Sequence, residues 1–231
     1  MNQLRAVQPH GPYLLGGLSY GGNVAFELCR LLHAAGEEVA LLALLDSHPP
    51  AAYAGSHSDD ISLLRAFPAV LRQYAGQPAR LSRTRLERLR PDQRLAALVG
   101  AIQRAGVLPA EVDAAGIELL FNAWRTHLLA VQAHRPAPLG HPQRTMMFHA
   151  RQPESPALLR LLGIALPRGI ESRGWRPLIN GGPFSVCDVD GSHFTLLHAS
   201  NVGGLAATLR RCLADIDGAG DGARVGREAA A

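Results

Sequence analysis

The chain has 231 residues, 47% of them hydrophobic and 18% charged, which is typical of a globular protein with one substantial core. Its formal net charge is +4 at pH 7, but all 23 basic residues are arginine and no basic run is interleaved with aromatic residues, which argues against nucleic-acid binding. No apolar stretch is long enough to span a bilayer, the N-terminus lacks a signal-peptide pattern, and three scattered cysteines favour neither a disulfide framework nor a metal site. We therefore expect a cytoplasmic protein that binds no membrane and no metal.

The first predicted elements form a strand–helix–strand unit. Pro12–Leu18 is apolar and ends in glycines, as a buried strand does. Tyr20–Ala35 has the apolar spacing of a helix, with Gly36 as its stop signal. Glu38–Leu45 is almost continuously apolar, which is typical of a parallel strand buried on both faces. The unit predicts two parallel strands joined by a right-handed crossover.

A different region follows, because residues 58–134 show helical periodicity with almost no strand pattern. The helices predicted there are Asp60–Tyr74, Arg83–Ala105 with a break at Pro91, and Ala110–His134. Beyond this region the pattern predicts two strands, Thr145–Ala150 and Phe184–Val189, and then a helix, Val202–Ile216. The sequence from Asp217 onward is small, polar and glycine-rich, so we expect it to be disordered.

These elements predict an α/β fold with a mostly parallel sheet, flanking helices and a helical insertion. We expect residues 1–50 and 145–216 to form the core and residues 51–144 to form the insertion. Residues 217–231 form the expected tail.

The turn between the first strand and the first helix reads Gly17-Leu18-Ser19-Tyr20-Gly21. A nucleophile elbow has this Gly-x-Ser-x-Gly pattern, because the strained turn from strand to helix needs small neighbours. We expect Gly17, Gly21 and Gly22 to supply that room, and the helix N-terminus to stabilise negative charge at Ser19. A phosphate-binding loop is less suitable, since both glycine-rich phosphate patterns and lysine are missing from the sequence.

A serine hydroxyl needs a base to take its proton and an acid to orient that base. Asp46 follows the second predicted strand, and the carboxyl ends of parallel strands meet at one edge of a sheet. Asp46 is therefore the predicted catalytic acid. The alternatives are that Asp46 only forms the turn, and that Asp190 is the acid because it lies near a histidine in the sequence.

Ten histidines compete for the role of base. His193 is the predicted base, because it comes directly after the last strand and before the final helix, and so completes the order serine, aspartate, histidine. His198 is the serious rival. The remaining candidates lie in less suitable places: His48 in a Pro-Pro turn, His149 in a strand pattern that favours the core, and His127 and His134 on insertion helices.

With these residues placed, the chain resembles the thioesterase domains of nonribosomal peptide synthetases, which have the α/β-hydrolase fold. The resemblance lies in two segments, VQPHGPYLLGGLSYGGNVAFELCRLLHAAGEEVALLALLDSHPP and GWRPLINGGPFSVCDVDGSHFTLLHASNVGGLAATLRRCL. It implies that Ser19 is the nucleophile, Asp46 the acid and His193 the base. It also implies a variable helical lid across residues 51–144.

The resemblance further implies the reaction and the partner. Ser19 takes an acyl or peptidyl chain from the phosphopantetheine thioester of a carrier domain, and water or an internal nucleophile releases it by hydrolysis or cyclisation. No cofactor is bound directly. One oxyanion-hole donor is the backbone N–H of the residue after the nucleophile, here Tyr20.

In that family several strands precede the elbow, whereas the sequence before Ser19 has room for at most one strand. We therefore expect the N-terminal strands of the core to be missing. Two other functions stay open: a small-molecule esterase or lipase of the same fold, and a catalytically impaired fragment that acts as a docking module.

Overall fold

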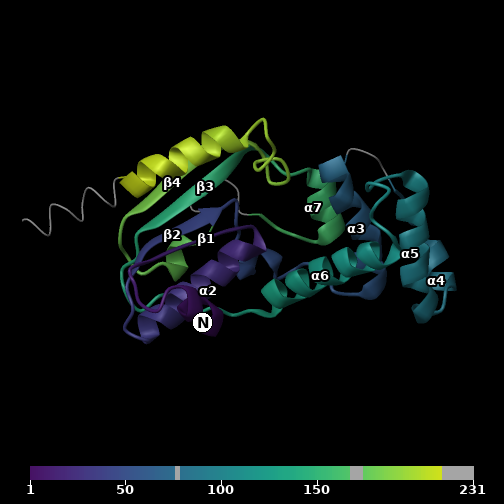
Figure 1. Cartoon of the computed structure of the whole chain (residues 1–231). Coiled ribbons are helices and arrows are strands. Elements are labelled where there is room, and N and C mark those ends of the chain that lie inside the picture. The colour runs from purple at the N-terminus through teal and green to yellow at the C-terminus, as the bar shows by residue number, and fades with distance from the viewer. Residues whose placement is uncertain (76–78, 167–173, 215–231) are drawn as a thin grey trace, which may run out of the picture. The chain divides into compact units, whose positions relative to one another are not determined.

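The computed structural model of the chain describes residues 1–75, 79–166 and 174–214 (Figure 1). These residues form two compact units. The sheet unit comprises the described residues of Met1–Ser47, Pro138–Pro153 and Pro177–Ala231. The helical unit comprises those of His48–Ala137 and Glu154–Arg176. The expected tail, residues 217–231, and Ile216 at the end of the last predicted helix lie outside the described residues.

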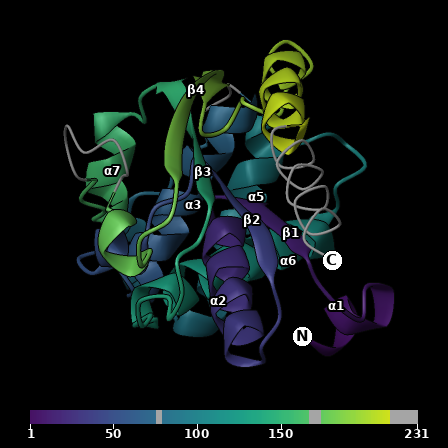
Figure 2. The same cartoon turned by 90° about the vertical axis from the view of Figure 1, so that its left-hand side faces the viewer.

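The sheet unit contains four parallel strands in the order β1-β2-β3-β4 within the described part of the chain (Figure 2). The strands are β1 (Tyr13–Leu18), β2 (Val39–Leu45), β3 (Thr145–Gln152) and β4 (Phe184–Ser192). Each lies where the sequence predicts a strand, and the last two run a few residues further. The predicted α/β fold with a mostly parallel sheet is confirmed.

Helices flank this sheet because its central strands are apolar on both faces. Leu41 and Ala43 of β2 pack in one apolar cluster with Leu205, which lies on the helix of residues 202–214. The intervening residues Leu42 and Leu44 point to the opposite face by strand alternation, and both are fully buried. Helix α2 (Tyr20–Ala34) packs against β1 and β2, and a short helix α1 (Asn2–Val7) precedes β1.

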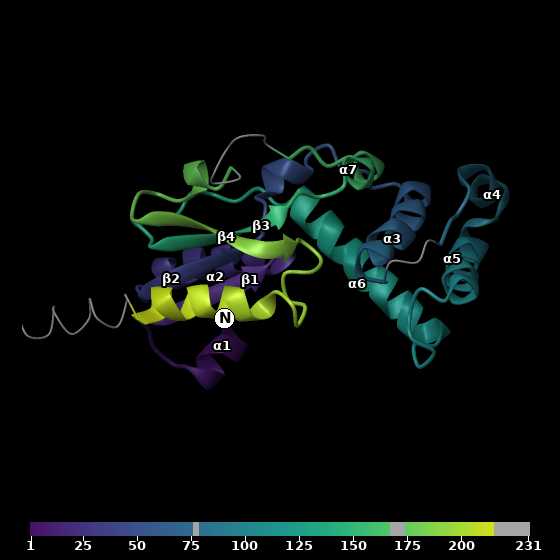
Figure 3. The same ribbon diagram turned by 90° about the horizontal axis from the view of Figure 1, so that it is seen from above.

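The helical unit contains the helices of the middle region (Figure 3). They are the 3₁₀ helix η1 (Pro50–Tyr53), α3 (Asp60–Ala75), α4 (Arg83–Arg88), α5 (Pro91–Ala105) and α6 (Ala114–Ala133), and the unit also includes α7 (Pro156–Leu162). Their apolar faces meet in a separate core in which the rings of Phe67 and Phe121 contact edge to face at 5.4 Å between centroids.

Two helix boundaries show how local chemistry sets the ends. The predicted break at Pro91 is confirmed, because Pro91 is the first residue of α5, where a missing N–H costs nothing. The helix expected from Ala110 begins instead at Ala114. Asp113 caps it there, since the Asp113 side chain accepts a hydrogen bond from the backbone N–H of Gly116 at 2.8 Å.

The bounds of the two units differ from the expected core and insertion at three places, the first being residues 48–50, which belong to the helical unit. Residues 138–144 belong to the sheet unit, where the Gln143 side chain donates to the carbonyl of Val39 at 3.0 Å. The described residues of 154–176 belong to the helical unit, where the N–H of His57 donates to the carbonyl of Leu162 at 2.9 Å. In the part of the chain that the structure describes, none of the helices has the length and apolar character needed to cross a membrane.

Candidate active site

Ser19 stands at the turn between β1 and α2 with φ 54° and ψ −121°. Only two non-glycine residues in the described chain have positive φ, and Ser19 is one of them. A side chain at positive φ is strained, and such strain marks the nucleophile elbow of α/β-hydrolases. The strand–elbow–helix arrangement predicted for Ser19 is therefore present.

Two of the three glycines around Ser19 are required by space. A Cβ atom on Gly17 would collide with the backbone carbonyl of Gly21, and one on Gly22 would collide with the side chain of Ser47. A Cβ atom on Gly21 would meet no described atom within 4 Å. The room at the elbow thus comes from Gly17 and Gly22, and the prediction that Gly21 also supplies it is wrong.

Asp46 follows β2 directly, has φ 42° and is completely buried. Its carboxylate Oδ1 accepts a hydrogen bond from the N–H of Ala150 at 2.9 Å, and its own N–H donates to the carbonyl of Phe148 at 2.7 Å. Both partners lie on β3, so the neighbouring strand holds the carboxylate in one orientation.

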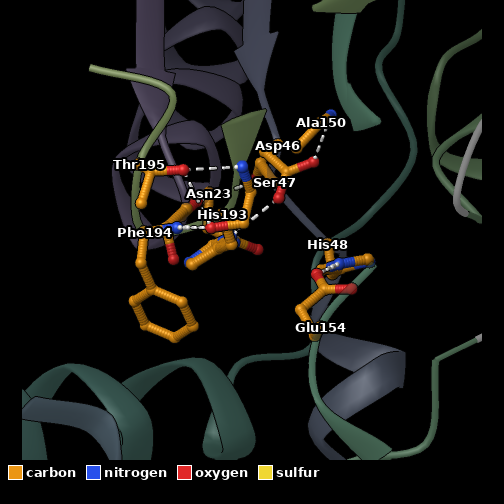
Figure 4. Close-up of polar contacts among 11 residues, drawn as sticks. Asn23, Asp46, Ser47, His48, Ala150, Glu154, His193, Phe194 and Thr195 are labelled. Carbon is orange, nitrogen blue, oxygen red and sulfur yellow. Dashed lines mark hydrogen bonds and ion pairs between the residues drawn. The ribbon is translucent and has the colours of Figure 1, made fainter. Parts of the chain in front are cut away.

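His193 follows β4 directly and meets Asp46 (Figure 4). Its Nδ1 lies 2.8 Å from Asp46 Oδ2, although the two residues are 147 positions apart in the sequence. The His193 side chain is 16% exposed, so one part of the ring remains accessible. The pairing of a buried carboxylate with Nδ1 orients the imidazole and leaves Nε2 to accept a proton.

The loop that carries His193 is fixed by its own short contacts. The N–H of Ser192 donates to Thr195 Oγ1 at 2.8 Å, and the N–H of Phe194 donates to Ser192 Oγ at 3.3 Å. The Phe194 ring also meets the His193 ring edge to face, with centroids 5.0 Å apart. These contacts hold the imidazole where Asp46 can reach it.

The rival residues have other positions or partners. His198 is exposed, and Asp190 forms an ion pair with Arg151 at 2.6 Å. His149 lies on β3 as predicted, but the prediction that it belongs to the core is wrong, because its side chain is partly exposed and pairs with Asp188 at 3.0 Å. His127 and His134 lie on or next to α6, and His48 pairs with Glu154 at 3.3 Å within the helical unit (Figure 4).

Ser19 belongs to the same edge of the sheet as Asp46. Leu18 pairs with Leu45 across the two strands, and the N–H of Ser19 donates to the carbonyl of Leu45 at 2.9 Å. Among the interactions of these described residues, no hydrogen bond joins the Ser19 hydroxyl to the His193 ring. Such hydrogen bonds are often long without substrate.

Sequence reasoning missed one residue at this edge. Ser47 is completely buried, and its hydroxyl donates to the backbone carbonyl of Ser19 at 2.7 Å. The sequence contains only an indirect signal for this contact: Ser47 follows Asp46, and Gly22 lies in the first turn of the helix. Neither a serine nor a glycine at these positions predicts the contact by itself.

Comparisons with known proteins show the family of this chain. A family model described as "Thioesterase domain" matches residues 1–213. The chain therefore belongs to the thioesterase domain family, and the resemblance to the thioesterase domains of nonribosomal peptide synthetases is confirmed.

Individual relatives are larger than this chain. Chondramide synthase of Chondromyces crocatus is 27% identical over 217 residues, which cover 90% of this chain but only 5% of the synthase. The crystal structure of a four-domain nonribosomal peptide synthetase, in its holo form with AMP and glycine, superposes with a TM-score of 0.73 at 25% identity. That match covers 91% of this chain and 15% of the synthetase.

A third match shows the fold alone. The NocB thioesterase domain, solved as a covalent complex with a fluorophosphonate analogue of nocardicin G, superposes with a TM-score of 0.54 at 23% identity. The match covers 92% of this chain and 71% of that domain.

Proposed function

We propose that the chain is a serine thioesterase that releases an acyl or peptidyl chain from the phosphopantetheine thioester of a carrier domain. One observation carries this proposal: the buried Asp46 carboxylate holds His193 Nδ1 at 2.8 Å, at the sheet edge where Ser19 occupies a strained turn. An acid, a base and a nucleophile at one edge are the groups that acyl transfer needs.

In the proposed reaction, His193 Nε2 takes the proton of the Ser19 hydroxyl as Ser19 Oγ attacks the thioester carbonyl carbon. The C–S bond then breaks, and the proton on His193 passes to the leaving phosphopantetheine sulfur. The acyl chain remains on Ser19 Oγ as an ester. Asp46 stays ionised throughout and stabilises the imidazolium that forms beside it.

Release repeats these steps with a second nucleophile. His193 takes a proton from water, or from an amine or hydroxyl of the acyl chain itself, and the new nucleophile attacks the Ser19 ester. The Ser19 oxygen leaves and recovers its proton from His193. Water gives a free acid, whereas an internal nucleophile gives a ring.

The tetrahedral intermediates carry negative charge on the former carbonyl oxygen, and backbone N–H groups stabilise such charge. We propose the Tyr20 N–H as one donor. Tyr20 is the first residue of α2, and the N–H groups of a helix's first turn point out of its N-terminus.

The carrier domain and the lid are proposed from the family. Two of the matches reported above are a synthase and a four-domain nonribosomal peptide synthetase, and the second is holo by its own description. A carrier domain would deliver the chain on phosphopantetheine, so the thioesterase itself needs no bound cofactor. We also propose that residues 51–144 act as a lid that shields the acyl-enzyme from water.

A comparison of two substrates tests the proposed function. The chain is given an acyl-N-acetylcysteamine thioester and the oxygen ester of the same acyl group, and kcat/KM is measured for each. We expect turnover of the thioester and a lower kcat/KM for the oxygen ester. A preference for the oxygen ester would identify a small-molecule esterase, and no turnover of either would support an impaired docking module.

A further inference from the structure

The loops that follow β1 and β2 are joined by a buried hydrogen bond. Ser47 Oγ donates to the carbonyl oxygen of Ser19 at 2.7 Å, across 28 positions of sequence. That carbonyl also accepts the N–H of Gly22 at 3.0 Å in the first turn of α2. Both lone pairs of the Ser19 carbonyl oxygen therefore have a donor.

This carbonyl shares a peptide group with the proposed oxyanion donor. The carbonyl of Ser19 and the N–H of Tyr20 lie in one plane and, in a trans peptide, point in opposite directions. A hydrogen bond that fixes the direction of the Ser19 carbonyl consequently fixes the direction of the Tyr20 N–H. Because an accepted hydrogen bond also polarises the peptide group, it strengthens that N–H as a donor.

Ser47 is itself held in place from two sides. Asn23 Nδ2 donates to Ser47 Oγ at 3.5 Å, which favours a hydroxyl proton directed to the Ser19 carbonyl. The first turn of α2 packs so closely against Ser47 that only glycine fits at position 22. Ser47 also follows Asp46 in the chain, so one loop carries both the carboxylate and this hydroxyl.

From this arrangement we propose that Ser47 is a positioning residue that sets the direction of the Tyr20 N–H and so prepares the oxyanion hole. The inference rests on the proposed function. Ser47 touches no reacting atom in this account and acts through the Ser19–Tyr20 peptide group.

The variant Ser47→Ala tests the inference. It removes the hydroxyl and leaves the Asp46–His193 pair in place. We expect kcat with the acyl-N-acetylcysteamine thioester to fall on the order of tenfold, less than the roughly 10²–10³-fold that follows removal of an oxyanion donor. KM should change little, because the oxyanion forms only after binding.

Two readouts separate positioning from a structural role. The pH at half-maximal kcat/KM should stay at the parental value, since the base and its carboxylate are unchanged. Rates are normalised to the fraction of chain that a fluorophosphonate titrates, which removes the effect of misfolded protein. Parental kcat in the titrated fraction would overturn the inference, and so would a shifted pH midpoint.

Thr145→Val is the matched control. Thr145 also has a buried hydroxyl, which donates to the carbonyl of Gln143 at 3.3 Å at the start of β3, away from the carboxyl ends of the strands. We expect the kcat of this variant to equal the parental value, even if its unfolding temperature changes as much as that of Ser47→Ala. A loss of kcat equal to that of Ser47→Ala would contradict the inference.

A second variant covers the case in which Ser47→Ala does not fold. Ser47→Cys fills the site with a weaker donor, so kcat should again fall, and parental kcat would overturn the inference. A different result would contradict the proposed function: the parental chain would show no thioester turnover and no fluorophosphonate labelling at Ser19. The two failures can therefore be told apart.

Discussion

Ser19 and Asp46 both have positive φ, 54° and 42°, and each directly follows one member of a residue pair, Leu18 and Leu45, on neighbouring parallel strands. The sheet thus ends at the same level in both strands, and each chain turns sharply there. Because Leu18 pairs with Leu45, the residues that follow them, Ser19 and Asp46, lie at the same edge of the sheet. The register of β1 on β2 thus brings the proposed nucleophile and acid to one edge.

The glycines at the elbow should differ in their tolerance of a methyl group. Gly17→Ala places a Cβ atom into the Gly21 carbonyl, so we expect it to destabilise the fold by about 1–3 kcal/mol and to reduce Ser19 labelling. Gly21→Ala meets open space among the described atoms and should be neutral or stabilising by up to about 1 kcal/mol. Urea unfolding of both variants measures the difference, and equal effects would contradict it.

Replacing His193 and replacing His198 should have clearly different effects on kcat. His193→Ala removes the imidazole that Asp46 orients, so kcat should fall by about 10³-fold or more. His198→Ala alters an exposed side chain and should leave kcat within about twofold of the parental value. Thioester turnover measures both. A larger loss in His198→Ala would overturn the assignment of the base.

Replacing the buried carboxylate of Asp46 by its amide should inactivate the enzyme without unfolding the chain. In Asp46→Asn the amide oxygen can still accept the Ala150 N–H, which leaves the NH₂ group facing His193 Nδ1. This favours the wrong tautomer, and kcat should fall by about 10³–10⁴-fold. The control is Asp190→Asn, which alters an exposed acid paired with Arg151 and should be close to parental. Similar kcat values for both variants would show that Asp46 is not the acid.

A buried thiol should make the chain sensitive to high pH. Burial raises the pKa of Cys29 to about 12. In the unfolded chain the thiol titrates near its ordinary value of about 8.5, so above that pH the unfolded state binds fewer protons and is favoured. This group's contribution is complete below pH 8.5 and declines toward pH 12 by at most about 1.4 kcal/mol per pH unit.

Cys29→Ala removes this titration, at the cost of a cavity that is the same at every pH. Its free energy of unfolding should therefore decline less steeply than that of the parental chain between pH 9 and 11. Urea unfolding at pH 8, 9, 10 and 11 gives both slopes. Parallel curves would contradict the assignment.

The elements that the sequence predicts well are those with a local cause. Strands β1 and β2 are apolar runs that end next to glycines or an aspartate, the break at Pro91 needs only a missing N–H, and the elbow has its own residue pattern. The Asp46–His193 contact followed from chain order, because parallel strands bring their carboxyl ends to one edge.

The features that the sequence did not predict depend on distant contacts. The bond from Ser47 to the Ser19 carbonyl requires the register of β1 on β2, and the exposed pair of His149 and Asp188 requires that of β3 on β4. The placement of residues 154–166 in the helical unit likewise follows from tertiary packing. Residue type alone does not indicate any of these.

The central claim is that Ser19 carries the acyl chain, and the most direct test is the mass of the protein during turnover. The chain is mixed with an acyl-N-acetylcysteamine thioester, quenched in acid and measured intact, and the modified peptide is then located. The account predicts an increase equal to one acyl group, on Ser19, in the parental chain and none in Ser19→Ala. An adduct on another residue, or one that persists in Ser19→Ala, would contradict it.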